Sequence, residues 1–193
     1  MRHRSIKVKS TLLAMIALFA FSYGCSTMTT EEKDIRRAEL DAMADKAIAG
    51  LIEQDPGLQT KMDESLGYAV ANMKLTKVPI VGAGGGEGVF IDKETGKRTY
   101  FTVSRLDLGG GWGARSFKIL LLIESPEMLD RMNSKRIWEF QAGAEASAGT
   151  ASAEGSSSDL NEDFTTHVLS DGGASATVTA RVIRIKVNKA LTD

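Results

Sequence analysis

The chain has 193 residues and a formal net charge of −1, and 42% of its residues are hydrophobic. This length is enough for one domain with a sizeable core. The single cysteine excludes a disulfide framework and a thiolate zinc site. The two histidines, His3 and His167, are too few for the histidine cluster of a catalytic zinc centre, so no metal site is expected.

The first 24 residues are predicted to be a signal peptide. Basic residues precede an apolar run over residues 11–21, and this run is too short to span a bilayer as a helix. Ser22-Tyr-Gly-Cys25 follows, and a small residue directly before a cysteine is typical of a bacterial lipobox. We therefore expect lipid attachment at Cys25, with an ordinary signal peptide as the alternative.

An acylated Cys25 would hold the chain on a membrane of the cell envelope, because each buried methylene contributes about 0.8 kcal/mol. Ser26 is not the aspartate that retains Gram-negative lipoproteins on the inner membrane. We expect the outer membrane for a Gram-negative source, with the chain facing the periplasm. Residues 25–30 would then be a lipidated tether, and residues 31–193 a single domain.

Helices are expected first along the chain. Residues 29–54 combine a capping box with apolar residues at helical spacing. Asp55-Pro56-Gly57 is expected to end this helix and to begin a short second one, with Asp55 as its N-cap, that stops at Gly67. The pattern then changes to strands, and Lys93–Lys97 predicts a hairpin turn with Gly96 at positive φ.

The second half of the chain continues the mixed pattern. Residues 116–123 are apolar enough for a buried strand, a helix is expected from Ser125 to about Asn133, and residues 138–146 alternate as a half-buried strand. Residues 149–163 have the composition of a flexible loop. A last hairpin is expected around residues 171–173, with a bulge near Val182 and Ile183.

These elements predict an α+β fold. Amino-terminal amphipathic helices would pack on a mostly antiparallel, glycine-rich β-sheet or partly closed barrel.

The glycine-rich segment Gly82–Gly88 is not typical of a nucleotide-binding loop. Such a loop needs a helix after its glycines, whereas Val89-Phe-Ile follows here and predicts a strand. Glycines that permit bends, bulges or close strand packing are the simpler interpretation. No nucleophile stands in a recognisable arrangement with a base and an orienting acid, so we expect no catalytic residues and no enzyme activity.

The charge is unevenly distributed along the chain. Without the first 24 residues, twenty basic residues face twenty-five acidic ones, which gives a net charge of −5. Residues 71–140 nevertheless carry a net charge of +3. Basic residues there are candidates for contacts with an anionic headgroup, although polar faces of strands also carry such residues. The candidates are Lys74, Lys77, Arg105, Arg115 and Lys118.

Four segments, taken in order, resemble the SYLF domain family. They are Leu66-Gly-Tyr-Ala-Val70, Val81-Gly-Ala-Gly-Gly-Gly-Glu-Gly-Val89, Gly109-Gly-Gly-Trp-Gly-Ala-Arg-Ser116 and the alanine-rich stretch Ala142–Gly149. The resemblance spans roughly residues 35–149 and implies binding of anionic phospholipid, partly through an amphipathic helix near the amino terminus.

The leading hypothesis is therefore a non-enzymatic envelope lipoprotein whose domain binds phospholipid headgroups or acyl chains. The alternative is a scaffolding lipoprotein that binds a protein or cell-wall partner in the periplasm. Neither hypothesis includes a cofactor or a nucleic-acid partner.

Overall fold

The computed structural model describes residues 28–149 and 164–192. The predicted signal peptide, Cys25 and the predicted loop beyond Gly149 lie outside these ranges. Residues 31–193 form one compact unit. Four helices are described, α2 (Thr30–Gln54), α3 (Leu58–Glu64), α4 (Pro126–Ser134) and α5 (Lys189–Thr192). Within the described part of the chain, no helix is long and apolar enough to cross a membrane.

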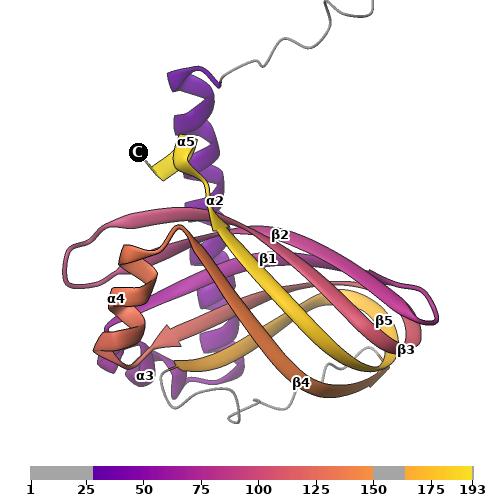
Figure 1. Ribbon diagram of the computed structural model, residues 1–193. Coiled ribbons are helices and arrows are strands. Elements are labelled where there is room, and N and C mark those ends of the chain that lie inside the picture. Colours follow the sequence, from indigo (N-terminus) through magenta and orange to yellow (C-terminus); the bar gives the residue numbers. More distant parts are fainter. Residues whose placement is uncertain (1–27, 150–163, 193) are drawn as a thin grey trace, which may run out of the picture. The chain divides into compact units, whose positions relative to one another are not determined.

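Five strands form a single sheet in the order β1-β2-β3-β5-β4, and every pairing between them is antiparallel (Figure 1). The strands are β1 (Gly67–Lys77), β2 (Val81–Asp92), β3 (Arg98–Ile123), β4 (Ile137–Gly149) and β5 (Phe164–Val187). The predicted α+β fold with an antiparallel sheet is confirmed. The sheet curls but does not close. Its edges are β4 and the first part of β5, and no pairing among the described residues joins these two.

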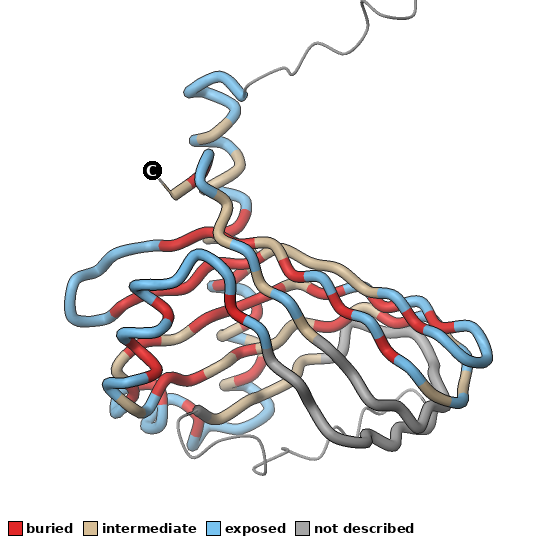
Figure 2. Tube along the Cα trace, viewed as in Figure 1, coloured by how far each residue is buried: buried red, intermediate tan, exposed pale blue. Residues whose placement is uncertain are grey.

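The long strand β3 organises the sheet. Its first part pairs with β2, from Arg98 opposite Ile91 to Leu108 opposite Val81. Its last part pairs with β1 over residues 113–123, so β3 follows both sides of the β1–β2 hairpin. Over residues 103–108 of β3, buried positions alternate with exposed ones, as the colours of the tube in Figure 2 show.

Each face of the sheet carries its own hydrophobic core. On the outer face, the apolar side of α2 packs against strand residues that include Val70, Val89 and Leu120. On the inner face, α4 and Trp138 pack against Phe90, Phe101 and other strand residues. Burial on both faces explains why the middle of the sheet is apolar at successive positions rather than at alternate ones.

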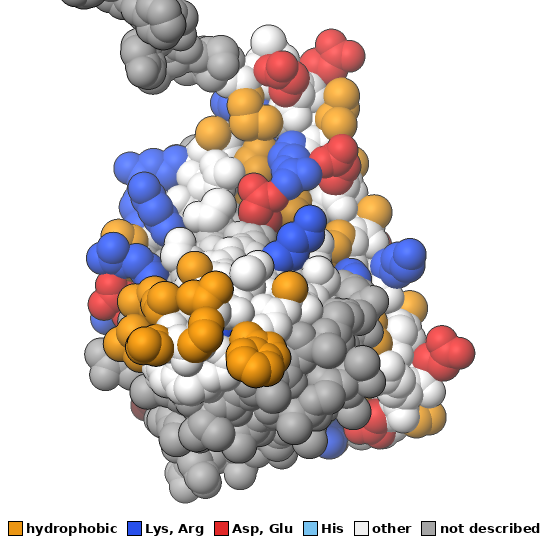
Figure 3. All heavy atoms as spheres, turned by 90° about the vertical axis from the view of Figure 1, so that its right-hand side faces the viewer, with side chains coloured by type: hydrophobic (Ala, Val, Ile, Leu, Met, Phe, Trp, Pro, Cys, Tyr) orange, Lys and Arg blue, Asp and Glu red, His pale blue; other side chains and the backbone are white. Residues whose placement is uncertain are grey.

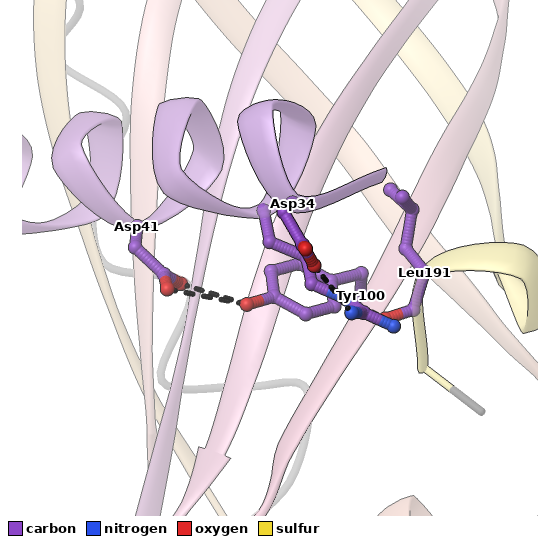
Figure 4. Close-up of polar contacts among 5 residues, drawn as sticks. Asp34, Asp41, Tyr100 and Leu191 are labelled. Carbon is purple, nitrogen blue, oxygen red and sulfur yellow. Dashed lines mark hydrogen bonds and ion pairs between the residues drawn. The ribbon is translucent and has the colours of Figure 1, made fainter. Parts of the chain in front are cut away.

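Polar contacts hold the amino-terminal half of α2 on the outer face. Tyr100 donates its hydroxyl to both oxygens of the Asp41 carboxylate at 3.2 Å, and Arg37 Nε donates to the Leu191 carbonyl at 2.7 Å (Figure 4). Arg98 forms an ion pair with Asp41 at 2.7 Å. Burial, and next the Asp41 carboxylate, raise the pKa of Tyr100, so its hydroxyl stays protonated as a donor.

The predicted β2–β3 turn is confirmed, with Gly96 at φ 69°. Asp92 holds this turn, since its carboxylate accepts hydrogen bonds from the Glu94 and Thr95 amides at 3.0 and 3.1 Å and from Asn133 Nδ2 at 2.8 Å. Burial alone would raise the pKa of Asp92, but the Asn133 side chain and the turn amides outweigh burial and lower it.

We therefore expect Asp92 to make stability depend on acidic pH. Its folded-state pKa lies below the unfolded value, so the unfolded chain binds more protons and stability is lost as pH falls through the folded-state pKa, below about pH 4. Urea unfolding at a series of pH values should show a steeper acid-side loss for the wild type than for Asp92→Asn. Parallel pH profiles for the two proteins would contradict this role.

Two sequence predictions about element ends are wrong. The second helix begins at Leu58 with Gly57 as N-cap, because the Asp55 side chain accepts from the Gly57 amide in a turn before the helix. That helix ends at Glu64, and Gly67 is the first residue of β1.

The predicted final hairpin is also wrong. Residues 164–187 form one continuous strand, and the expected turn at Asp171 is a bulge, since Ser116 lies opposite Gly172 and Phe117 opposite Ser170. The register is unbroken through Val182 and Ile183, where the sequence predicted the bulge.

Candidate anion-binding site at the hairpin end of the sheet

Alternate glycines of β2 form a flat stripe on the inner face. Gly82, Gly84 and Gly86 lie opposite Lys77, Leu75 and Met73 of β1. A Cβ on Gly86 would lie 2.2 Å from the Asn72 carbonyl oxygen and 2.6 Å from the Met73 sulfur. The stripe therefore gives the larger side chains of β1 room to pack, and the interpretation of the glycines as packing positions is confirmed.

Along this inner face, side chains change from apolar to charged toward the β1–β2 hairpin. Met73 and Phe117 are buried in the inner core. One step along, Leu75 lies opposite Arg115, and one step further Lys77 is the last residue of β1. The buried charged residues at this end of the sheet form what we call the inner charge cluster, which comprises Lys77, Arg105, Asp107 and Arg115.

An ion pair forms one part of the inner charge cluster. Arg105 donates from Nε and from its second terminal nitrogen to the two oxygens of Asp107 at 2.7 and 2.9 Å, and both side chains are almost fully buried. The Arg115 guanidinium lies over the Phe117 ring, 4.9 Å from its centroid. Such a bidentate pair satisfies the single carboxylate of the cluster. The described side chains of the cluster thus carry a net charge of +2.

Lys77 is the unusual member of this cluster. It is 3% exposed, and within the described ranges its Nζ has no hydrogen-bond partner. Its stem and the Cβ of Asp107 both lie beside Gly82, yet the Asp107 carboxylate is engaged by Arg105. A buried ammonium without a partner is energetically costly, so its presence requires an explanation beyond packing. An anionic ligand would supply that partner.

The structure separates the five basic residues that the sequence selected. Lys77, Arg105 and Arg115 come together on the inner face, whereas Lys74 and Lys118 lie on the outer face. Strand alternation gives the reason, because residues an odd number of positions apart on one strand point to opposite faces. Lys74 is exposed and Lys118 is half-buried.

Asp107 was not among the residues selected from the sequence. The sequence could have indicated it, because Arg105 and Asp107 are two positions apart on a strand and their side chains therefore share a face.

An exposed apolar surface lies at the same end of the sheet. We call it the apolar tip, and its members are Val78, Ile80, Val81, Leu106, Leu108 and Trp112. Figure 3 shows apolar side chains gathered on this end of the molecule. Trp112 is 71% exposed and Ile80 is 77% exposed. Single exposed apolar residues are ordinary, whereas a contiguous group of this kind marks an interaction surface.

Comparison with known proteins gives a partial match. The chain is similar to part of Beta cell expansion factor A from Aeromonas veronii, with 28% identity over 118 residues. The match covers 61% of this chain and 44% of that protein, so less than half of the relative is represented. The relative is of the SYLF-domain type, and the similarity gives weak support to the resemblance seen in the sequence. No family model matches the chain.

Proposed function

We propose that this chain is a SYLF-type domain that binds anionic phospholipid and catalyses no reaction. The Lys77 ammonium carries this proposal: it has no hydrogen-bond partner in the described part of the chain, and it is buried in a cluster whose described side chains have a net charge of +2. A phosphate group is a suitable partner, because it accepts hydrogen bonds from lysine and arginine and neutralises their charge.

The position of Lys77 gives a headgroup a way to reach it. Lys77 ends β1, and the turn to β2 follows at once, with the Val78 amide donating to the Val81 carbonyl at 3.0 Å. The amine is buried in this structure, and the four-carbon stem is long enough to carry it from there toward a headgroup at the end of the sheet. Arg105 and Arg115 then supply positive potential from the neighbouring stretches of β3.

The membrane attachment expected at Cys25 belongs to the same proposal. An acylated cysteine on the tether would place residues 31–193 next to a bilayer of the cell envelope, most simply the outer membrane. The domain would then meet phospholipid at high local concentration.

Co-sedimentation with vesicles tests the proposal. Protein from residue 26 onward, which contains the whole compact unit 31–193, is mixed with neutral or anionic vesicles at low and at physiological salt. We expect binding to anionic vesicles that weakens as salt rises, since screening shortens the reach of the cations. Binding that ignores lipid charge, or no binding, would contradict the proposal. The latter result would favour a scaffold whose apolar tip meets a protein.

A further inference from the structure

We infer that the apolar tip enters the interfacial layer of the membrane, so that the domain docks with the β1–β2 hairpin first. This inference rests on the proposed function and adds which surface makes the contact. The tip is exposed and apolar, and Figure 3 shows apolar side chains gathered on this end of the molecule.

The spacing between apolar and cationic residues matches the layers of a bilayer interface. Two cations of the inner charge cluster lie three positions along β3 from an exposed apolar residue, Arg105 from Leu108 and Arg115 from Trp112. Lys77 ends β1 directly before the turn that carries Val78 and Ile80. Three strand residues span up to about 10 Å. An element buried about 5–10 Å into the boundary between headgroups and acyl chains would therefore hold the cations near the phosphates. An apolar layer at the tip followed by a layer of cations fits a phospholipid surface better than an apolar protein partner.

Backbone hydrogen bonds brace the tip. The Gly109 amide donates to the Ile80 carbonyl at 2.9 Å, and the Gly111 amide donates to the Pro79 carbonyl at 3.3 Å. Gly109 and Gly111 adopt φ values of 141° and 133°, which side-chain-bearing residues rarely accept. The hairpin turn is thus fixed to the middle of β3, and a fixed apolar surface loses little conformational entropy when it enters a membrane.

The amphipathic helix offers a poorer membrane surface. The apolar side of α2 is occupied, because Leu40, Ala44, Ala47 and Leu51 are buried against the sheet. Insertion of that side would require α2 to leave the outer core. The apolar tip needs no such rearrangement.

Tryptophan fluorescence tests the inference directly. The chain has two tryptophans, and Trp112 is 71% exposed at the tip whereas Trp138 is 2% exposed in the inner core. The emission of Trp112→Phe is subtracted from that of the wild type, using protein from residue 26 onward and anionic vesicles that contain lipids brominated on their acyl chains. We expect the Trp112 component to shift to shorter wavelength and to be quenched.

Sedimentation of the same samples distinguishes failure of lipid binding from failure of the tip as the inserted surface. Bound protein whose Trp112 emission is neither shifted nor quenched would overturn the tip as the inserted surface while leaving lipid binding intact. No bound protein at all would contradict the proposed function and this inference with it.

A charge placed on the tip gives a second readout. Leu108→Glu should weaken binding to anionic vesicles about tenfold or more, because an apolar contact is lost and a repelled charge is gained. Ser104→Glu is the matched control, since it puts the same charge at an exposed position on the same face of β3, further from the tip. Equal weakening by both variants would overturn the inference, because it would reflect net charge alone.

Discussion

Gly86→Ala is expected to destabilise the domain by about 3 kcal/mol, the upper range for overpacking in a well-packed interior. The added methyl would lie 2.2 Å from the Asn72 carbonyl oxygen and 2.6 Å from the Met73 sulfur. Methionine can move its sulfur, but the carbonyl belongs to β1 and can move only if the β1–β2 ladder opens. Urea unfolding followed by circular dichroism measures the change.

The neighbouring glycine provides the control for this prediction. Gly85 has the same strand environment, yet a Cβ there would meet only the Val103 carbonyl oxygen, at 3.4 Å. Gly85→Ala should therefore change the free energy of unfolding by less than about 1 kcal/mol. Equal destabilisation by the two variants would mean that loss of glycine flexibility, rather than contact with β1, sets the cost.

Lys77→Met is expected to stabilise the ligand-free domain by about 2 kcal/mol, the scale of an unsatisfied buried polar group. Methionine retains an unbranched apolar side chain beside Gly82, and it removes the ammonium that has no partner in the described part of the chain. A gain in stability at a functional position is the expected signature of a group retained for binding. Thermal and urea unfolding without lipid measure the effect.

Lys74→Met is the matched control for that substitution. Lys74 lies on the same strand but is exposed on the outer face, so its loss should leave stability almost unchanged. If Lys77→Met instead destabilised the domain, Lys77 would be a structural residue with a satisfied amine, and the main support for the anion site would be lost.

Much of the fold could be predicted from local patterns. Residues 29–54 were expected to be helical and form α2 over 30–54, and the turn at Gly96 and the helix opened by Ser125 are found as expected. These elements depend on capping, periodicity and turn chemistry, which act over a few residues.

The errors arise where distant strands decide the outcome. Asp171-Gly-Gly173 has the composition of a turn, yet β3 pairs with β5 from Phe101 to Ile123 on both sides of a bulge, and this pairing keeps β5 extended. Strand β3 also runs without interruption through the glycine cluster Gly109–Gly113. A single sequence does not show which partner strand will satisfy these backbone groups.

The candidate site was predictable only in part. Three of the five selected basic residues, Lys77, Arg105 and Arg115, come together, whereas Lys74 and Lys118 lie on the other face. The proximity of the first three depends on the sheet order, in which β1 pairs with the last part of β3 and β2 with its first part, and local spacing does not reveal this order. The apolar tip was equally hidden, because its members come from the hairpin turn and from the middle of β3.

The most direct test of the proposed function compares vesicle binding by the wild type, Lys77→Met and Lys74→Met at physiological salt. Loss of a lysine that contacts a headgroup should weaken binding to anionic vesicles about fivefold, the equivalent of about 1 kcal/mol. We expect this loss for Lys77→Met and a change of less than about twofold for Lys74→Met, whose exposed charge is screened. Unchanged binding by Lys77→Met would contradict the assignment of the inner charge cluster as a phospholipid site.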